Sequence, residues 1–320
     1  MTSRIKALGA FILLSAFLGV GVHLQAANEV GLSGRIYTDY TYNFSNNFNG
    51  FNVNRVYLGY EGQLTNSIDY VVTSDVEVGG SSSSSRLFMK YAYGRWKSNC
   101  GRFTIGMLPL NAFDVQKKTW GLRYLYKTVM NEYKFSSSAD IGVGYEKQVT
   151  DEFSISTIIS NGTGYKMAEN DKYKRLHVRL LFGPDNLGKE TGINAGVYGS
   201  WEPEKLVDYA NNYTIAGFAG IHQNNLWVGA EAAVQQDNTI NLQTTLFSVY
   251  GRYEVAQYTQ AFLRLDTRSF DVTGSDTELA FIAGAQYAKY KGVNVAPNLV
   301  YSKIGSNDTV TGRLNFEFRW

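Results

Sequence analysis

Polar and apolar side chains alternate over residues 311–320 at the end of the chain. Because successive side chains of a strand point to opposite faces, this pattern predicts an amphipathic β-strand. Its apolar and aromatic face would carry Gly312, Leu314, Phe316, Phe318 and Trp320. About ten residues are enough for a tilted strand to cross a bilayer. The segment therefore predicts the closing strand of a membrane-spanning barrel, and a terminal strand of a soluble β-sandwich stays open as the alternative.

The same alternation recurs along the chain and predicts about sixteen strands joined by turns and loops. The predicted strands are residues 35–42, 51–64, 68–78, 86–97, 102–108, 141–149, 153–160, 173–182, 193–201, 213–221, 226–235, 245–253, 261–268, 279–287, 293–302 and 311–320. Short joints such as 150–152 contrast with longer polar loops such as 79–85, 163–172 and 202–212. Short turns at one end and longer loops at the other are typical of outer-membrane barrels.

The alternation fails over residues 109–138. A segment of about 30 residues without a strand pair usually has a function of its own. We expect it to be a long third loop that folds toward the lumen and narrows it. An extra hairpin or an external cap remains the alternative.

Many strands with one apolar face predict an all-β fold, a transmembrane antiparallel β-barrel of about sixteen strands. Lipid offers no hydrogen bonds, so only a closed ring of strands satisfies every backbone group inside a membrane. A barrel of this size is too wide to be filled by side chains and would hold water. Pro297 cannot donate to a ladder, and we expect a bulge or a local break in the pairing there.

Residues 1–26 have the features of a secretory signal peptide. Arg4 and Lys6 precede an uncharged apolar run over 7–22, and Ala26 offers a small residue for cleavage. A single membrane anchor is the alternative, although the run is short for one. The predicted domains are therefore the signal peptide, 1–26, and an outer-membrane barrel, 27–320.

Composition agrees with a barrel and limits other functions. The chain has 4 Pro, 32 Gly, 23 Tyr and 18 Phe, which suits continuous strands with aromatic rings at the membrane interface. A net charge of only +2 argues against a nucleic-acid partner. The single Cys100 excludes an intramolecular disulfide framework, and no metal, nucleotide or cysteine-site motif is present. We therefore expect no cofactor and no metal.

Two passages of the chain resemble the phosphate-selective porin O/P family. One is FNVNRVYLGYEGQL at 51–64; the other runs from Gly106 through the long loop to ADIGV at 139–143 and SNG at 160–162. The resemblance implies a sixteen-stranded, trimeric diffusion channel of the bacterial outer membrane with a constriction loop. The chain lacks a basic ladder of that family's kind, so the resemblance does not carry phosphate selectivity.

Charged residues of the long loop are the first candidates for the pore constriction. They are Lys117, Lys118, Arg123, Lys127 and Lys134, against Asp114 and Glu132. Further candidates on the inward faces of strands are Arg55, Arg175, Arg179, Arg264, Asp75 and Glu77. A positive loop in the lumen would favour anions. Alternatively, most of these arginines pair with acids on the lumen wall, so we expect mild anion preference at most.

The predicted partners follow from this architecture. They are outer-membrane lipid, small solutes or anions in the lumen, other copies of the chain in a homotrimer, and the barrel-assembly machinery. Leu314, Phe316, Phe318 and Trp320 would present the closing strand to that machinery.

Two other classes of protein remain possible, an outer-membrane barrel enzyme and a secreted β-rich binding protein or adhesin. Hydrolysis by a lipase or protease needs a base beside a nucleophile. His177 and His222 are the histidines beyond the signal peptide, and neither has a recognisable serine or acid partner in the sequence. We therefore expect a channel and no enzyme.

Overall fold

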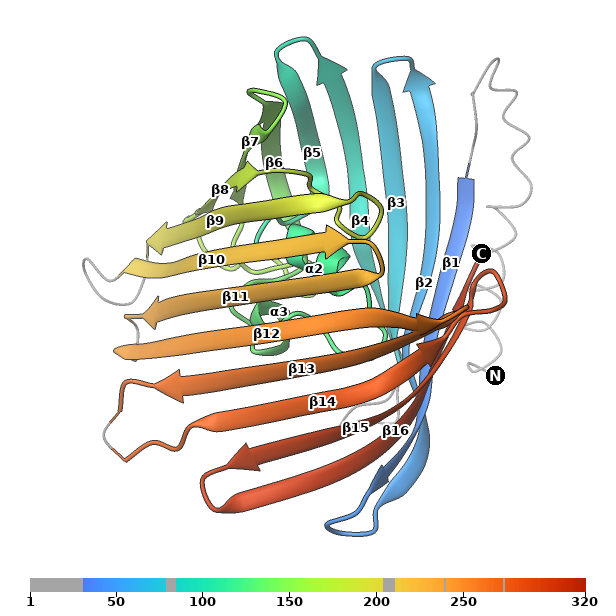
Figure 1. Cartoon of the computed structure of the whole chain (residues 1–320). Coiled ribbons are helices and arrows are strands. Elements are labelled where there is room, and N and C mark those ends of the chain that lie inside the picture. The colour runs from blue at the N-terminus through green and yellow to red at the C-terminus, as the bar shows by residue number, and fades with distance from the viewer. Residues whose placement is uncertain (1–30, 79–84, 204–210, 239, 273) are drawn as a thin grey trace, which may run out of the picture.

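The computed structural model describes residues 31–78, 85–203, 211–238, 240–272 and 274–320. Sixteen antiparallel strands close into one barrel in which each strand pairs with its sequence neighbours and β1 pairs with β16 (Figure 1). The strands are β1 (Gly31–Asn43), β2 (Asn49–Thr65), β3 (Ile68–Glu77), β4 (Arg86–Ser98), β5 (Gly101–Pro109), β6 (Ala139–Gln148), β7 (Phe153–Ser160), β8 (Arg175–Phe182), β9 (Gly192–Pro203), β10 (Asn211–Gln223), β11 (Leu226–Asp237), β12 (Leu242–Ala256), β13 (Thr259–Phe270), β14 (Glu278–Tyr287), β15 (Val293–Ile304) and β16 (Asn307–Arg319). The predicted fold class and the predicted strands are confirmed.

The outer face of the barrel is apolar and the inner face is polar. On β16, Leu314 and Phe318 are exposed, whereas Asn315 and Glu317 between them are buried. Trp320 continues this strand, and its backbone N–H and C=O both bond to Gly34 of β1. Closure satisfies the backbone groups that lipid cannot satisfy.

Two bulges shift the phase of the alternation near the start of the barrel. Between β1 and β2 the register jumps at Tyr37/Thr38 and leaves Asn54 without an opposite residue. Between β3 and β4 it jumps at Thr73/Ser74 and leaves Lys90 without one. A bulge re-aims the side chain of its extra residue, and both of these side chains contact groups of the lumen wall.

The predicted irregularity at Pro297 is a local break in one ladder. Pro297 pairs with Leu314 on the β16 side. Toward β14, the register passes from Gly284↔Asn298 to Tyr287↔Val295 with no pairs in between. The missing N–H of proline accounts for this break.

The long segment between β5 and β6 contains two short helices that the sequence analysis did not predict. They are α2 (Asp114–Trp120) and α3 (Val129–Glu132). Val115, Thr119 and Trp120 are buried at helical spacing, and Gly121 ends α2 in a left-handed conformation that suits glycine. Buried residues in α2 recur at the spacing of a helix and not at every second position, which explains why the alternation fails in this segment.

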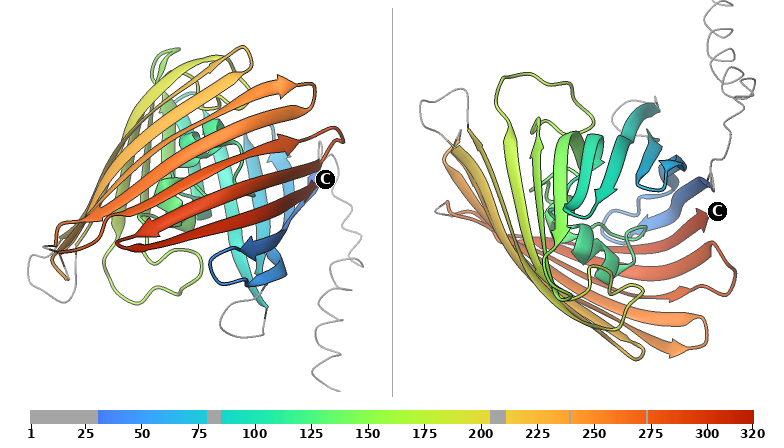
Figure 2. Two further views of the ribbon diagram at one scale, coloured as in Figure 1. Left: turned by 60° about the horizontal axis from the view of Figure 1, so that its bottom comes forward. Right: turned by 90° about the horizontal axis from the view of Figure 1, so that it is seen from above.

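Both helices contact strands far from their own attachment point. α2 contacts β10, β11 and β12, and α3 contacts β12. The views of Figure 2 agree that the segment lies within the ring of strands. The contacted side chains, such as Tyr250 and Leu246, alternate with the exposed apolar residues Phe247 and Val249. The segment therefore packs on the inner face of the wall.

Within the described ranges, no helix is long and apolar enough to cross a membrane. The predicted signal peptide at 1–26 lies outside the described residues, as do most of the loops predicted at 79–85 and 202–212.

Candidate functional site

Two cavities lie between the long segment and the wall formed by β1 to β4. One has a volume of about 460 Å³ and includes Asp39 and Thr41, toward the end of the barrel that carries the longer loops; we call it the loop-side cavity. The other has about 260 Å³ and includes Ser33 and Gly34, toward the short turns; we call it the turn-side cavity. Both cavities are lined by Tyr37, Tyr57 and Arg123. The two cavities therefore adjoin at the level of these three residues.

Aromatic packing holds the segment on the far wall, opposite these cavities. The Trp120 side chain is fully buried, and its ring lies 5.4 Å from Tyr250 and 6.1 Å from Phe262, centroid to centroid. Its indole N–H donates to the carbonyl of Tyr126 at 2.8 Å. Edge-on aromatic pairs of this kind fix the orientation of the Trp120 ring and also bury apolar surface.

Polar anchors add to this packing at three strands. Arg264 of β13 donates to the carbonyl of Lys127 at 2.6 Å and pairs with Asp266 at 2.7 Å. On β8, Arg179 pairs with Asp114 of α2. The Tyr124 hydroxyl donates to Gln286 Oε1 of β14 at 2.9 Å. Buried charges need such partners, so these arginines fix the segment in place.

The charges of the loop-side cavity are largely paired. Arg55 lies 3.3 Å from Asp75 and 3.5 Å from Glu77, and Lys127 lies 3.3 Å from Glu132. Asp39, which also lines this cavity, accepts bonds from the side chains of Asn52, Asn54 and Thr41. Arg313 and Arg123 complete the charged lining.

The loop between β7 and β8 contacts two of these carboxylates, those of Asp75 and Glu77. The Tyr165 hydroxyl donates to Asp75 at 2.6 Å, and Lys166 pairs with Glu77 at 2.5 Å. This contact joins residues about ninety positions apart in the sequence and covers part of the wall at the loop side.

The turn-side cavity is strongly basic. Its charged lining residues are Arg35, Lys90, Lys117 and Arg123. Lys117 and Arg123 have no carboxylate within ion-pair distance in the described part of the chain, and Lys90 lies 4.0 Å from Asp75. Burial, together with the nearby Arg123, lowers the pKa of Lys117 to about 8.

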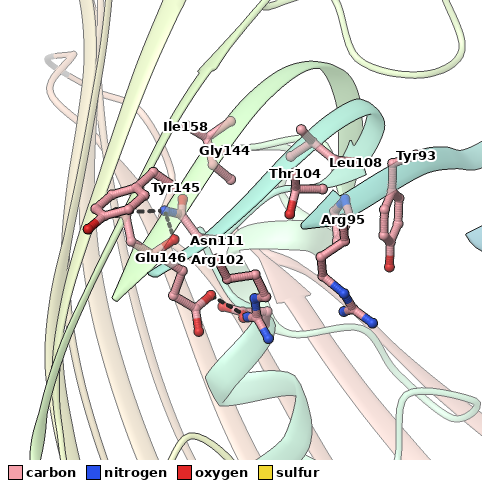
Figure 3. Close-up of a pocket in the computed structure, with 13 residues that line it drawn as sticks. Tyr93, Arg95, Arg102, Thr104, Leu108, Asn111, Gly144, Tyr145, Glu146 and Ile158 are labelled. Atoms are coloured by element: carbon pink, nitrogen blue, oxygen red, sulfur yellow. Dashed lines mark hydrogen bonds and ion pairs between the residues drawn. The ribbon is translucent and has the colours of Figure 1, made fainter. Parts of the chain in front are cut away.

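A third, smaller cavity of about 100 Å³ lies against β4 to β7 (Figure 3). Its arginines point toward acids rather than into open space: Arg102 pairs with Glu146 at 2.7 Å, and Arg95 pairs with Asp69 at 2.8 Å. Asn111 donates to the carbonyl and hydroxyl of Ser156 beside them. This cavity therefore differs from the turn-side cavity in having its positive charges neutralised.

The structure brings together only part of the predicted constriction set. Lys117 and Arg123 border the turn-side cavity, while Arg55 and Lys127 border the loop-side cavity beside the buried Asp75 and Glu77. Four other predicted residues lie inside the barrel but apart from both cavities and carry ion pairs: Lys118 with Asp185, Arg175 with Glu202, Arg179 with Asp114, and Arg264 with Asp266. Arg175 and Arg264 pair with acids of the strands, as the alternative expected, whereas Arg179 pairs with the long segment and Lys118 pairs with a loop residue. Lys134 is exposed and also lies outside both cavities.

Sequence reasoning missed Lys90, Arg35 and the tyrosines that border the turn-side cavity. In strict alternation Lys90 falls on the face of Phe88 and Ala92, and the bulge turns it inward. Alternation puts Tyr57 on the same face as Arg55, but nothing in the sequence indicates that its ring and that of Tyr37 pack against the long segment.

His177 has a serine partner that the sequence did not reveal. Its Nε2 lies 3.1 Å from Ser160 Oγ, and its Nδ1 lies 2.8 Å from the Tyr198 hydroxyl. Ser160 Oγ donates to Asp140 at 2.9 Å. Ser160 and His177 are 1% and 0% exposed. A nucleophile must be reached by substrate, so this buried network has the geometry of a structural contact.

His222 also has a structural environment. Its ring stacks on Trp227 with 4.2 Å between centroids, and its Nδ1 lies 2.8 Å from the carbonyl of Glu190. Within the described ranges, no group of three or more His, Cys, Asp or Glu residues is placed to hold a metal ion.

Comparisons with known proteins give a match at the level of structure. No protein-family model and no curated protein sequence matches the chain. The loop L8 deletion mutant of OmpT, an outer membrane protein of Vibrio cholerae, has a TM-score of 0.69 and 14% identity, covering 92% of this chain and 100% of that one. OmpF of Salmonella typhi, in complex with daunomycin, has a TM-score of 0.67 and 12% identity, covering 92% and 98%. The anion-selective porin from Comamonas acidovorans has a TM-score of 0.65 and 11% identity, covering 91% and 99%.

This chain has the porin fold. The closed sixteen-stranded barrel matches the fold of bacterial outer-membrane porins, and the outer-membrane location stays a prediction. The narrower resemblance to the phosphate-selective porin O/P family stays a prediction, since no family model matches.

Proposed function

We propose that the chain forms a water-filled channel through which small hydrophilic solutes and ions diffuse passively, with a mild preference for anions. The observation that carries this proposal is the pair of cavities between the long segment and the β1 to β4 wall. The end with the short turns would face the periplasm, as in other outer-membrane barrels. The long segment would then act as the constriction.

The anion preference rests on Lys117 and Arg123. Both project from the segment into a space where they have no ion-pair partner among the described residues. Fixed positive charge at a narrow, low-dielectric passage raises the local concentration of anions and lowers that of cations. Most other charges on the lumen wall are paired and contribute little net field.

Reversal potentials in a planar bilayer test this function. With purified, refolded protein and a KCl gradient, we expect the reversal potential to shift toward that of chloride. Arg123→Gln should reduce the shift by roughly a third, since it removes one of the three cations that border the cavity from the segment and from β4. Lys134→Gln, in the same segment but exposed and outside both cavities, is the matched control. A cation preference contradicts the selectivity, and absence of conductance contradicts the channel.

We also propose that three copies of the chain assemble and that the barrel is inserted by the assembly machinery through its closing strand. The support for a trimer is the OmpT of Vibrio cholerae described as a trimer form, which this chain resembles in fold. Leu314, Phe318 and Trp320 present an exposed apolar row at the end of the chain for that recognition. The native mass of the detergent-extracted protein tests the trimer; a monomer contradicts it.

A further inference from the structure

The turn-side cavity has more positive charge than its surroundings neutralise. We propose that it is a binding site for small dianions, held between Lys117 and Arg123 of the long segment and Lys90 of β4. The proposal rests on the proposed function, because it places a saturable site within the same pore. Sulfate and a short dicarboxylate share the required chemistry, two negative charges carried on oxygen atoms within a few ångströms.

The charge balance selects a dianion over a monoanion. Asp75 is the carboxylate near Lys90, but it lies closer to Arg55, at 3.3 Å against 4.0 Å, and it also accepts a bond from Tyr165. Asp75 is therefore shared and cannot neutralise Lys90 fully. Lys117 and Arg123 add two further cations without ion pairs in the described part of the chain. Arg35 is a fourth cation of the lining, and the Glu317 carboxylate of the neighbouring strand β16 lies near it. One negative charge would leave the cavity strongly positive, whereas two bring it closer to neutrality.

The cations are fixed in position rather than free to move apart. The bulge at Thr73/Ser74 turns Lys90 into the lumen, where its ammonium donates to the Tyr57 hydroxyl at 3.2 Å and lies 4.5 Å from the centre of the Tyr57 ring. Its side chain is 6% exposed. Arg123 donates through Nη1 to Asn131 Oδ1 at 2.6 Å, which leaves its other N–H groups for a ligand. Preorganised donors bind an anion without the cost of ordering them first.

The size of the cavity suits a small ligand. A volume of about 260 Å³ equals roughly nine waters at about 30 Å³ each. A sulfate or a three-carbon dicarboxylate fits this space together with some of its water. Charge-assisted hydrogen bonds from lysine and arginine would replace the water that the anion loses.

The loop-side cavity offers no equivalent site. Its Arg55 and Lys127 are engaged by Asp75, Glu77 and Glu132, and the negative charge of Asp39 offsets the positive charge of Arg313 in the same lining. Arg123 is the charged residue that borders both cavities, so an anion would meet it from either side. A dianion should therefore reside on the turn side.

Isothermal titration calorimetry of the purified full barrel in detergent tests the site without requiring conductance. We expect sulfate and malonate to bind with one site per chain and acetate to bind much more weakly. Lys117→Gln and Arg123→Gln should each weaken sulfate binding about tenfold, the loss expected for a hydrogen bond to a charged group. Lys134→Gln should leave the dissociation constant unchanged.

The pattern across anions and variants decides the outcome. Binding of only one of the two dianions, sulfate or malonate, supports the site and shows which kind of dianion it prefers. Equal binding of acetate, or an equal loss in Lys134→Gln, overturns the proposal, because a diffuse positive field would then explain the binding. Detergent resistance and gel mobility of each variant show that the barrel has folded.

Bilayer recordings separate this proposal from the proposed function. Sulfate added on the turn side should reduce the chloride current in a saturable way that Lys117→Gln relieves. A channel that conducts chloride but shows neither block nor calorimetric binding contradicts the dianion site and leaves the channel intact. Calorimetric binding to a barrel that does not conduct supports the site and contradicts the channel.

Discussion

Asp75 shows how a single buried carboxylate organises the lumen wall. It is fully buried, and it contacts Arg55, Lys90 and the Tyr165 hydroxyl. These partners come from β2, β4 and the loop after β7. An isolated buried charge is costly, and several donors around it offset that cost. Because three partners share this one carboxylate, the positive charge of Lys90 beside the turn-side cavity is only partly neutralised.

Lys117 predicts a pH dependence of the anion preference. With a pKa lowered to about 8 by burial and by Arg123, the amine carries a charge of about 0.9 at pH 7 and about 0.1 at pH 9. The charged form exists below the pKa, so the preference should fall as pH rises through 8. The groups that face Lys117 are Lys90 and Arg123 across the cavity and Asp114 and Lys118 on its own helix.

Reversal potentials at pH 6, 8 and 9.5 measure this effect. Lys117→Arg is the control, because arginine stays protonated throughout this range. The fall should be smaller in that variant. An identical pH profile in the two proteins would show that Lys117 does not set the preference.

At the scale of elements, the spacing of apolar residues along the chain determines which strands and helices could be predicted from the sequence. Residues 311–320 and the other fifteen strands alternate clearly, so their faces were predictable. α2 was not, because a seven-residue helix buries only Val115, Gln116, Thr119 and Trp120 and is hard to distinguish from an irregular loop. Lys90 was missed for a different reason: a one-residue bulge reverses the facing of the strand residues beyond it, and sequence alone does not place bulges.

The ion pairs of the site were also beyond sequence reasoning. Arg179 and Asp114 lie 65 positions apart, and Arg264 bonds to a carbonyl 137 positions away. Such contacts depend on where the long segment crosses the barrel. Its inward folding was expected, but its docking strands were not.

Trp120→Ala tests how the long segment is held. Removing a fully buried indole costs about 3 kcal/mol or more in a packed core, and here the loss falls on the contact between α2 and the far wall. The segment should become mobile, so single-channel conductance and open-channel noise should both rise. Trp201→Ala on the outer face, where the side chain is 46% exposed, is the matched control. Unchanged conductance in Trp120→Ala would mean that the polar anchors suffice.

At the scale of the whole molecule, the seam between β16 and β1 completes the barrel. Nine residue pairs join the two strands, from Arg35↔Arg319 to Asn43↔Thr311, and two backbone bonds join Trp320 to Gly34. The Trp320 side chain lies over Gly34 so closely that any Cβ at that position would collide with its ring. The absence of a side chain at Gly34 therefore makes room for the final residue.

Gly34→Val should weaken closure. The added side chain must displace the indole of Trp320, so we expect a lower unfolding temperature and a smaller fraction of compact barrel in gels of unboiled samples. Gly94→Val on β4, where no atom lies within 4 Å of an added Cβ, is the control. Equal stability of the two variants would indicate that the indole moves aside freely.

The segment that crosses the barrel also braces it mechanically. It is tied to β8 through Arg179, to β13 through Arg264 and to β14 through Tyr124, at points spread around the ring. A hollow cylinder of hydrogen-bonded strands can flatten when the surrounding lipid presses unevenly on its sides. A rigid internal tie resists that deformation. Solutes would thus encounter an aperture of constant shape, whatever the tension or thickness of the bilayer around it.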